Sequence, residues 1–116
     1  MTYKNLDTST SFQALKNLEA SDLKQILHPE RIKSYQVNAS EKLVYNYAAM
    51  PVDENHLSVL QQLSDELQLT QKYQALVDGE VMNTGEKRLV LHHLTRGQVG
   101  KPVKADGEDK GAFYEE

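Results

Sequence analysis

The spacing of apolar residues changes twice along this chain, and these changes limit the folds that it can adopt. Over residues 10–28, apolar side chains recur at helical spacing. Over residues 34–48 they alternate with polar side chains, as in a pair of strands with one apolar face. Helical spacing returns over residues 53–97. We therefore expect a mostly α fold with one small antiparallel β-hairpin.

Capping residues indicate where the first helices begin and end. Thr10 and Gln13 match a capping box, in which the threonine oxygen accepts a backbone N–H and the glutamine reaches back. Ser21 or Asp22 can cap a second short helical segment. Pro29 is expected to end that segment, because the residue before a proline is displaced from helical geometry.

The hairpin is expected to turn at Asn38-Ala39-Ser40. Leu43, Tyr45 and Tyr47 would then share one face of its second strand. Two strands alone are marginally stable, so this hairpin must pack on something else. An apolar patch around these three residues would mark a lost interface and would not mark a ligand site.

Three helices are expected after the hairpin. Asp53 is a good N-cap for the first, and Thr70 can cap the second, which ends at Asp78-Gly79 with Gly79 in a left-handed conformation. The third would begin at a capping box of Asn83 and Glu86. Leu91 and Leu94 would face inward in this helix until Gly97 ends it. Arg88 lies within its apolar stripe, so we expect a buried arginine paired with an acidic residue.

The two ends of the chain are expected to differ from its middle. Residues 1–9 suggest a flexible lead-in, and residues 98–110, rich in glycine and charge, suggest a loop. Residues 111–116 suggest the first turn of an interrupted helix, which is not stable alone. We therefore expect residues 1–116 to form a single truncated domain of a longer protein.

Charge and composition exclude several classes of function. The net charge is −4, from 17 acidic and 13 basic residues that are well mixed, so no basic surface for nucleic acid or an anionic membrane is expected. The absence of cysteine excludes disulfides, zinc–thiolate sites and a cysteine nucleophile. No apolar run approaches the length of a membrane span, and the first residues do not form a signal peptide. The expected location is the cytoplasm.

The histidines are the first candidates for a site. His92 and Arg96, four residues apart on the expected helix, share a face and could clamp a substrate phosphate, although a packing pair at the helix end is favoured. His92 and His93 point about 100° apart on a helix, so they cannot hold one metal ion from it. His28 and His56 are expected to lie on the surface or in caps.

The glutamates and glycines of the same region carry weaker signals. Glu80 and Glu86 could serve as a carboxylate pair for acid–base chemistry, but structural roles in the turn and the cap are favoured. Gly79 with Gly85 does not form a phosphate-binding loop. The stretch 97–101 is also too sparse in glycine, and it follows a helix when such a loop should precede one.

One stretch of eighteen residues resembles a segment of the phosphoglucose isomerase family. The pattern of that family is filled here by Gly79, Glu80, Asn83, Glu86, Arg88, Val90, Leu91, His92 and Arg96. Two positions depart from it, since Val81 stands for lysine and Gly85 for threonine. The resemblance extends in order and spacing over about residues 31–116, including Asp106-Gly107-Glu108-Asp109.

The resemblance implies both a fold and an activity. Members are cytosolic homodimers built on two α/β sugar-isomerase domains, and this chain would be the N-terminal scaffold around the first of them. They interconvert glucose 6-phosphate and fructose 6-phosphate through a cis-enediol, in glycolysis and gluconeogenesis, without an organic cofactor or metal. The catalytic glutamate, arginine, histidine and lysine of the family match no position here. We therefore expect no catalytic, cofactor-binding or metal-binding residue in this chain.

Two other classes of function remain open from the residues. The chain could be a stand-alone helical module for protein interaction, which should have a complete last helix and a self-contained core. It could also be a metal-binding regulator that uses its histidines. Loss of micromolar nickel or zinc binding on His92→Ala would be needed to support that reading.

Overall fold

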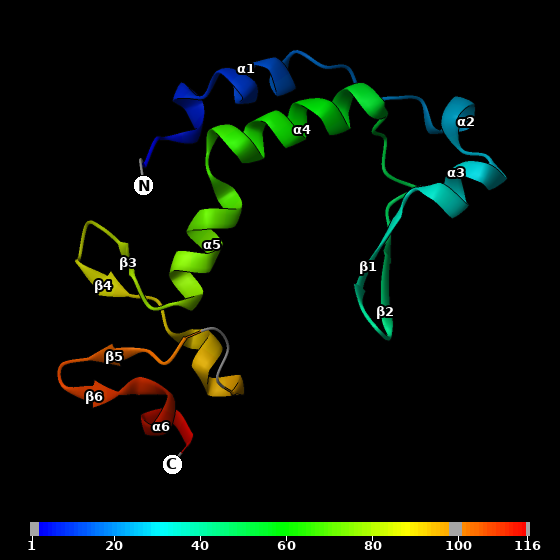
Figure 1. Ribbon diagram of the computed structural model, residues 1–116. Coiled ribbons are helices and arrows are strands. Elements are labelled where there is room, and N and C mark those ends of the chain that lie inside the picture. Colours follow the sequence, from blue (N-terminus) through cyan, green and yellow to red (C-terminus); the bar gives the residue numbers. More distant parts are fainter. Residues whose placement is uncertain (1–2, 98–100, 116) are drawn as a thin grey trace. The chain divides into compact units, whose positions relative to one another are not determined.

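The computed structural model describes residues 3–97 and 101–115 (Figure 1). The chain divides into two compact units, Lys4–Glu66 and Leu67–Glu116 together with Met1–Tyr3. In the described residues the strands form three two-stranded antiparallel sheets, and the other regular elements are helices. The expected helix-rich fold is confirmed, but the described residues form three antiparallel strand pairs where one hairpin was expected.

The first unit, Lys4–Glu66, is built mainly from short helices and one hairpin. Its elements are a 3₁₀ turn η1 (Leu6–Thr8), helices α1 (Thr10–Lys16), α2 (Leu23–Ile26) and α3 (Pro29–Ser34), strands β1 (Gln36–Ser40) and β2 (Leu43–Asn46), and helix α4 (Glu54–Glu66). Helix α1 lies along α4 (Figure 1).

The cap of α1 is Ser9, so the capping box predicted at Thr10 is wrong. The Ser9 side chain accepts a hydrogen bond from the Phe12 N–H, and Gln13 donates to the backbone oxygen of Asp7. Ser9 is fully buried. The flexible lead-in predicted for residues 1–9 thus includes the turn η1 and the buried cap Ser9, while residues 3–5 are exposed and have no regular structure. Residues 1–2 lie outside the described part.

Pro29 lies between two short helices, α2 and α3, and only part of the structure around it was predicted. Asp22, one of the two caps predicted, caps α2 by accepting from the Lys24 N–H. Helix α2 ends at Ile26, before Pro29, and Pro29 occupies the first turn of α3, which was not predicted. A proline is tolerated there because its missing N–H has no partner in the first turn of a helix.

The hairpin predicted over residues 34–48 is confirmed. Strands β1 and β2 pair in register from Gln36 opposite Asn46 to Asn38 opposite Val44, with an irregularity between Asn38 and Ser40. The turn lies at residues 41–42 and not at Asn38-Ala39-Ser40. All residues of both strands are exposed. Asp53 caps α4 as predicted, since its Oδ1 accepts from the N–H groups of Asn55 and His56.

The second unit begins with helix α5. Its elements are α5 (Leu69–Val77), strands β3 (Val81–Asn83) and β4 (Arg88–Leu89), the 3₁₀ helix η2 (His92–Arg96), strands β5 (Lys104–Ala105) and β6 (Glu108–Asp109), and α6 (Lys110–Glu115). The most buried apolar side chains of this unit are those of Ala75, Val77, Leu94 and Val103.

Helix α5 does not begin at the predicted cap, but it ends as predicted before Gly79. Thr70 is not its cap, because the helix begins at Leu69 after Gln68 in a left-handed conformation. At its end, the Glu80 N–H donates to the Ala75 oxygen and the Gly79 N–H to the Leu76 oxygen. Gly79 has a φ of 76°. This is the Schellman arrangement, in which glycine is preferred because a side chain is strained at positive φ.

The helix predicted from Asn83 to Gly97 is wrong. Residues 81–89 form the β3–β4 hairpin, and only His92–Arg96 are helical, as 3₁₀. Asn83 does accept from the Glu86 N–H at 3.2 Å, but within the hairpin turn. Lys87 then has a φ of 56°, which reverses the chain and prevents a continuous helix. Leu94 is buried, as expected.

The remaining segment is more regular than predicted. Residues 104–109, predicted as part of a loop, form the β5–β6 hairpin with Asp106 and Gly107 at positive φ. Residues 98–100 of that predicted loop lie outside the described part. Helix α6 begins at Lys110, where the Asp109 carboxylate accepts from the N–H groups of Gly111 and Ala112. This agrees with a helical start near residue 111, and residue 116 is not described.

Candidate functional site

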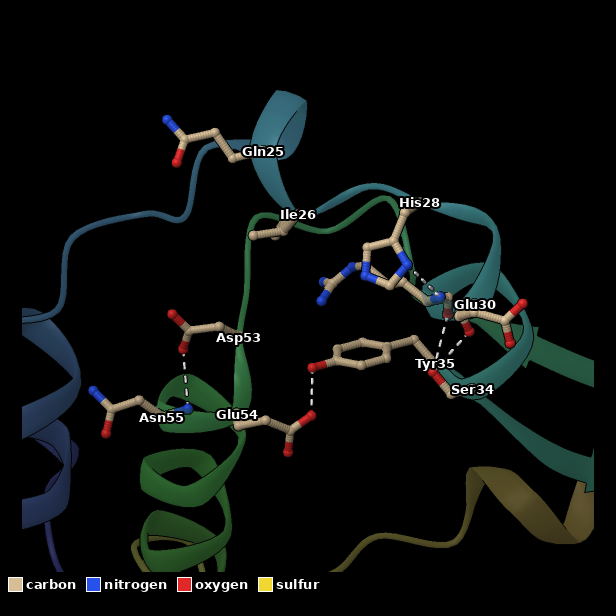
Figure 2. Close-up of a pocket in the computed structure, with 10 residues that line it drawn as sticks. Gln25, Ile26, His28, Glu30, Ser34, Tyr35, Asp53, Glu54 and Asn55 are labelled. Carbon is tan, nitrogen blue, oxygen red and sulfur yellow. Dashed lines mark hydrogen bonds between the residues drawn. The ribbon is translucent and has the colours of Figure 1, made fainter.

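A pocket of about 570 Å³ lies in the unit Lys4–Glu66, between α2, α3 and the start of α4 (Figure 2). It is lined by Gln25, Ile26, His28, Glu30, Arg31, Ser34, Tyr35, Asp53, Glu54 and Asn55. Three carboxyl groups, one guanidinium, one imidazole and one phenol therefore meet around it. Their existing partners decide what chemistry they can perform.

Arg31 is the buried cation of this site, with 4% of its surface exposed. Its Nε donates to the Ala48 oxygen at 2.8 Å, and its Nη2 donates to the Met50 and Val52 oxygens at 3.1 and 2.6 Å. These carbonyls belong to the segment that joins β2 to α4. A buried guanidinium needs such partners, because an unpaired buried charge is strongly unfavourable.

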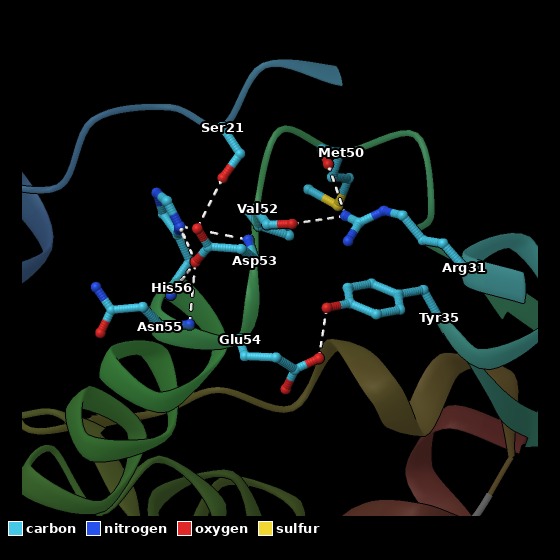
Figure 3. A network of polar contacts seen from close by, with 9 residues as sticks. All are labelled: Ser21, Arg31, Tyr35, Met50, Val52, Asp53, Glu54, Asn55 and His56. Atoms are coloured by element: carbon cyan, nitrogen blue, oxygen red, sulfur yellow. Dashed lines mark hydrogen bonds and ion pairs between the residues drawn. The ribbon is translucent and has the colours of Figure 1, made fainter. Parts of the chain in front are cut away.

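Tyr35 and Glu54 lie beside this arginine. The Tyr35 ring stacks under the guanidinium, and its hydroxyl donates to the Glu54 carboxylate (Figure 3). This hydrogen bond raises the pKa of the Tyr35 phenol, because the charged phenolate would lose it and would meet a second negative charge. The phenol therefore stays protonated at neutral pH and is not a ready general base.

Asp53 forms a second network at the N-terminus of α4. Its Oδ1 lies 2.7 Å from His56 Nδ1, and its Oδ2 accepts from the Ser21 hydroxyl at 3.0 Å (Figure 3). His56 Nδ1 also lies 3.3 Å from the Asp53 N–H. One ring nitrogen cannot both accept from the Asp53 N–H and donate to the Asp53 carboxylate. Because the contact with the carboxylate is the shorter one, we place a proton on Nδ1. These bonds, first that from His56, hold the Asp53 pKa well below its ordinary value.

The polar groups of the pocket thus act mainly on the chain itself. His28 accepts from the Arg31 N–H at 3.3 Å and caps α3, and His56 lies in the cap of α4. Both positions agree with the capping roles expected for these histidines. The buried role of Arg31 was not predicted from the sequence. The sequence gives only a weak indication of this role: His28 and Pro29 mark the start of the helix that carries Arg31.

The candidates in the second unit lie in and around η2. A hollow of about 550 Å³ is lined by His92, His93, Thr95 and Arg96. The shared helical face predicted for His92 and Arg96 is wrong, because residues three apart superpose in a 3₁₀ helix and residues four apart do not. Both ring nitrogens of His93 are buried and have no hydrogen-bond partner among the described residues.

The remaining candidates are separated and exposed. The Arg88 side chain is 76% exposed and lies 3.7 Å from Glu86, so the predicted buried ion pair is wrong. Because β4 replaces the expected helix, Arg88 has no apolar stripe to lie in. Glu80 directly precedes β3, and Glu86 lies in the turn that follows it. Gly79 ends α5, and Gly85 lies in the β3–β4 turn.

The described part of the chain comprises residues 3–97 and 101–115. No group of three or more His, Asp or Glu side chains is placed to hold a metal ion there. None of the helices in that part combines the length and apolar character needed to cross a bilayer.

Comparison with known proteins decides the family. The family model of phosphoglucose isomerase matches residues 46–114. The chain belongs to the phosphoglucose isomerase family. The match begins at the last residue of β2 and runs through α4 into α6, so both compact units contribute to it.

Curated relatives in this family are similar over nearly the whole chain. The glucose-6-phosphate isomerase of Borreliella afzelii is 44% identical over 92% of this chain and 20% of its own length. That of Treponema denticola is 42% identical over 98% of this chain and 23% of its own length. That of Treponema pallidum is 40% identical over the same shares. The chain therefore spans about a fifth of the length of these relatives.

Proposed function

We propose that this chain is the N-terminal part of a glucose-6-phosphate isomerase, which interconverts glucose 6-phosphate and fructose 6-phosphate. The observation that carries this proposal is identity of 40–44% to enzymes of that name over 92–98% of the chain. Similarity at this level along nearly every element is not expected of a module that shares only one motif. In the parent, the chain would form part of the scaffold around an α/β sugar-isomerase domain.

The catalytic groups of the parent enzyme are proposed to lie outside these 116 residues. Two features of the described residues support this. Asp53 and Arg31 are engaged with the chain's own backbone and side chains, and the Tyr35 phenol is held protonated by Glu54. Glu80 and Glu86 are separated along the chain by β3. None of these groups is free to move a proton on a sugar.

The parent is further proposed to be a cytoplasmic homodimer that acts without a cofactor or metal. The 116-residue chain would then form one N-terminal domain of each subunit. These statements rest on the resemblance to the family, whose members they describe. They can be tested by fractionation and by the mass of the purified parent in solution.

A coupled assay tests the central proposal. Fructose 6-phosphate is supplied, and the glucose 6-phosphate formed is oxidised by its NADP-dependent dehydrogenase and followed by absorbance. We expect no turnover by the 116-residue chain and clear turnover by the longer polypeptide encoded by the same gene. Activity of the short chain would contradict the placement of the catalytic groups. Inactivity of the long polypeptide would contradict the isomerase assignment and would favour a stand-alone interaction module.

A further inference from the structure

The β1–β2 hairpin has one apolar face. Side chains of cross-strand partners and of alternate residues share a face, and Val37 pairs with Tyr45. The face therefore carries Tyr35, Val37, Leu43, Tyr45 and Tyr47, which we call the tyrosine face. The rings of Tyr45 and Tyr47 lie 6.1 Å apart, and those of Tyr35 and Tyr47 lie 5.1 Å apart.

The outer part of the tyrosine face, at Val37, Leu43 and Tyr45, is uncovered, while Tyr35 and Tyr47 are half-buried. Val37, Leu43 and Tyr45 are each more than half exposed. The opposite face carries polar side chains, with Val44 as its one large apolar residue. An antiparallel pair normally turns its apolar face to a core and its polar face to water. Here the apolar face meets solvent.

The uncovered surface continues past the hairpin. The Tyr45 hydroxyl lies 3.5 Å from the sulfur of Met50, and the Met50 side chain is itself exposed. No residue of β1 or β2 is charged, Glu41 and Lys42 are confined to the turn at the tip of the hairpin, and Arg31 and Glu54 contact the tyrosine face at Tyr35. A contiguous apolar surface without charge is typical of a contact surface between parts of a protein.

We propose that the tyrosine face is the surface on which the remaining four fifths of a full-length phosphoglucose isomerase chain packs. This inference rests on the proposed function. The matched relatives extend over about five times the length of this chain, which supplies a covering part of the required size. The five side chains of the tyrosine face form a small patch, whereas stable interfaces between separate proteins bury roughly 1,200 Å² of total surface or more, so a second copy of the chain is a poorer occupant.

Hydrogen exchange of the hairpin amides tests the proposal. The 116-residue chain is compared with the longer polypeptide encoded by the same gene. We expect the amides of β1 and β2 to exchange at least about tenfold more slowly in the longer polypeptide, because covering the face suppresses local opening of the hairpin. Equal exchange in the two proteins would overturn the proposal. So would a gene that encodes no longer polypeptide.

Two valines provide a matched pair of variants. Val37 and Val44 are both 52% exposed and lie on adjacent strands, but on opposite faces. In the longer polypeptide, Val37→Ser should reverse most of the protection, and Val44→Ser should retain it. Equal effects of the two variants would overturn the role of the tyrosine face. Leu43→Ser, on the same face as Val37, gives an independent second variant.

Two further measurements distinguish the docking surface from the isomerase assignment and from contact with a second copy of the chain. The isomerase assay is run on the same samples. Protection of the hairpin in an inactive long polypeptide would support the docking surface and contradict the isomerase assignment. Activity without protection would overturn the docking surface alone. Protection of the 116-residue chain that rises with its own concentration would overturn the proposal in favour of a second copy.

Discussion

The guanidinium carbon of Arg31 lies 3.7 Å from the centre of the Tyr35 ring. Tyr35 is the residue that follows α3, and Arg31 lies one turn earlier in that helix. The ring therefore covers the guanidinium from one side while the carbonyls of residues 48, 50 and 52 bind its edge. One side chain thus joins α3, the end of the hairpin and the start of α4.

Replacing Arg31 with methionine should lower the free energy of unfolding of the unit Lys4–Glu66 by about 3 kcal/mol, since buried carbonyls lose their donors. Urea unfolding followed by far-ultraviolet circular dichroism measures this. Arg88→Met is the matched control, because the Arg88 side chain is exposed, and should change stability by less than about 0.5 kcal/mol. Equal effects of the two substitutions would contradict the difference in burial.

Ser9 and Thr10 give a second comparison. Ser9→Ala removes the acceptor for the Phe12 N–H and the donor to Glu66 Oε2 at 2.8 Å, so we expect a loss of about 1–2 kcal/mol. Thr10→Ala changes an exposed side chain that does not cap α1, and should be near neutral. A larger loss at Thr10 in the same urea experiment would restore the capping box predicted from the sequence.

Glu66 should make stability depend on pH. Its carboxylate accepts from the Ser11 and Thr10 N–H groups and from the Ser9 hydroxyl, which lowers its pKa to about 2. A pKa depressed on folding stabilises the protein above the ordinary value of 4.5, and this stabilisation is lost as pH falls toward about 2.

Glu66→Gln should therefore lower the thermal midpoint at pH 7, and the difference from the unsubstituted chain should shrink as the pH falls from about 4.5 to about 2. Glu41→Gln, in the exposed hairpin turn, controls for the removal of one negative charge. A difference that is constant across this pH range would show that the carboxylate is not bound as described.

Substitutions at Gly79 and Gly107 distinguish two causes of lost stability, backbone strain at positive φ and a steric clash with a neighbouring side chain. A Cβ at Gly79 would lie 2.4 Å from Val103 Cγ1, whereas a Cβ at Gly107 would meet nothing within 4 Å. Their φ angles are similar, 76° and 79°. Gly107→Ala should cost about 1 kcal/mol from backbone strain alone, and Gly79→Ala about 2 kcal/mol or more. Similar losses in thermal unfolding would show that Val103 moves aside freely.

Local signals predicted the fold well where one pattern had one meaning. The alternation over residues 34–48 has no helical equivalent, and Gly79 after an apolar helix matched its Schellman role. The pair Asn83 and Glu86 was ambiguous, because the same side-chain-to-backbone bond closes a hairpin turn or starts a helix. The expected helix failed for that reason, and the expected burial of Arg88 failed with it.

The pocket around Arg31 was not predictable in the same way. The partners of Arg31 are backbone oxygens 17 to 21 residues away. Every residue has a backbone carbonyl, so the residue types at these positions do not reveal the contact. The histidine caps were easier, since His28 and His56 each stand at a helix start marked by a proline or an aspartate. Long-range hydrogen bonds to the backbone can be recognised only in the folded structure.

The carbonyl cluster of residues 48–52 resembles a coordination shell whose central ion is a side chain. A bound metal ion would leave on dilution or in the presence of a chelator, but the guanidinium is tethered to α3 and cannot diffuse away. Its burial also protects it from screening by salt. The geometry of the segment between β2 and α4 should therefore be indifferent to the ionic composition of the solution.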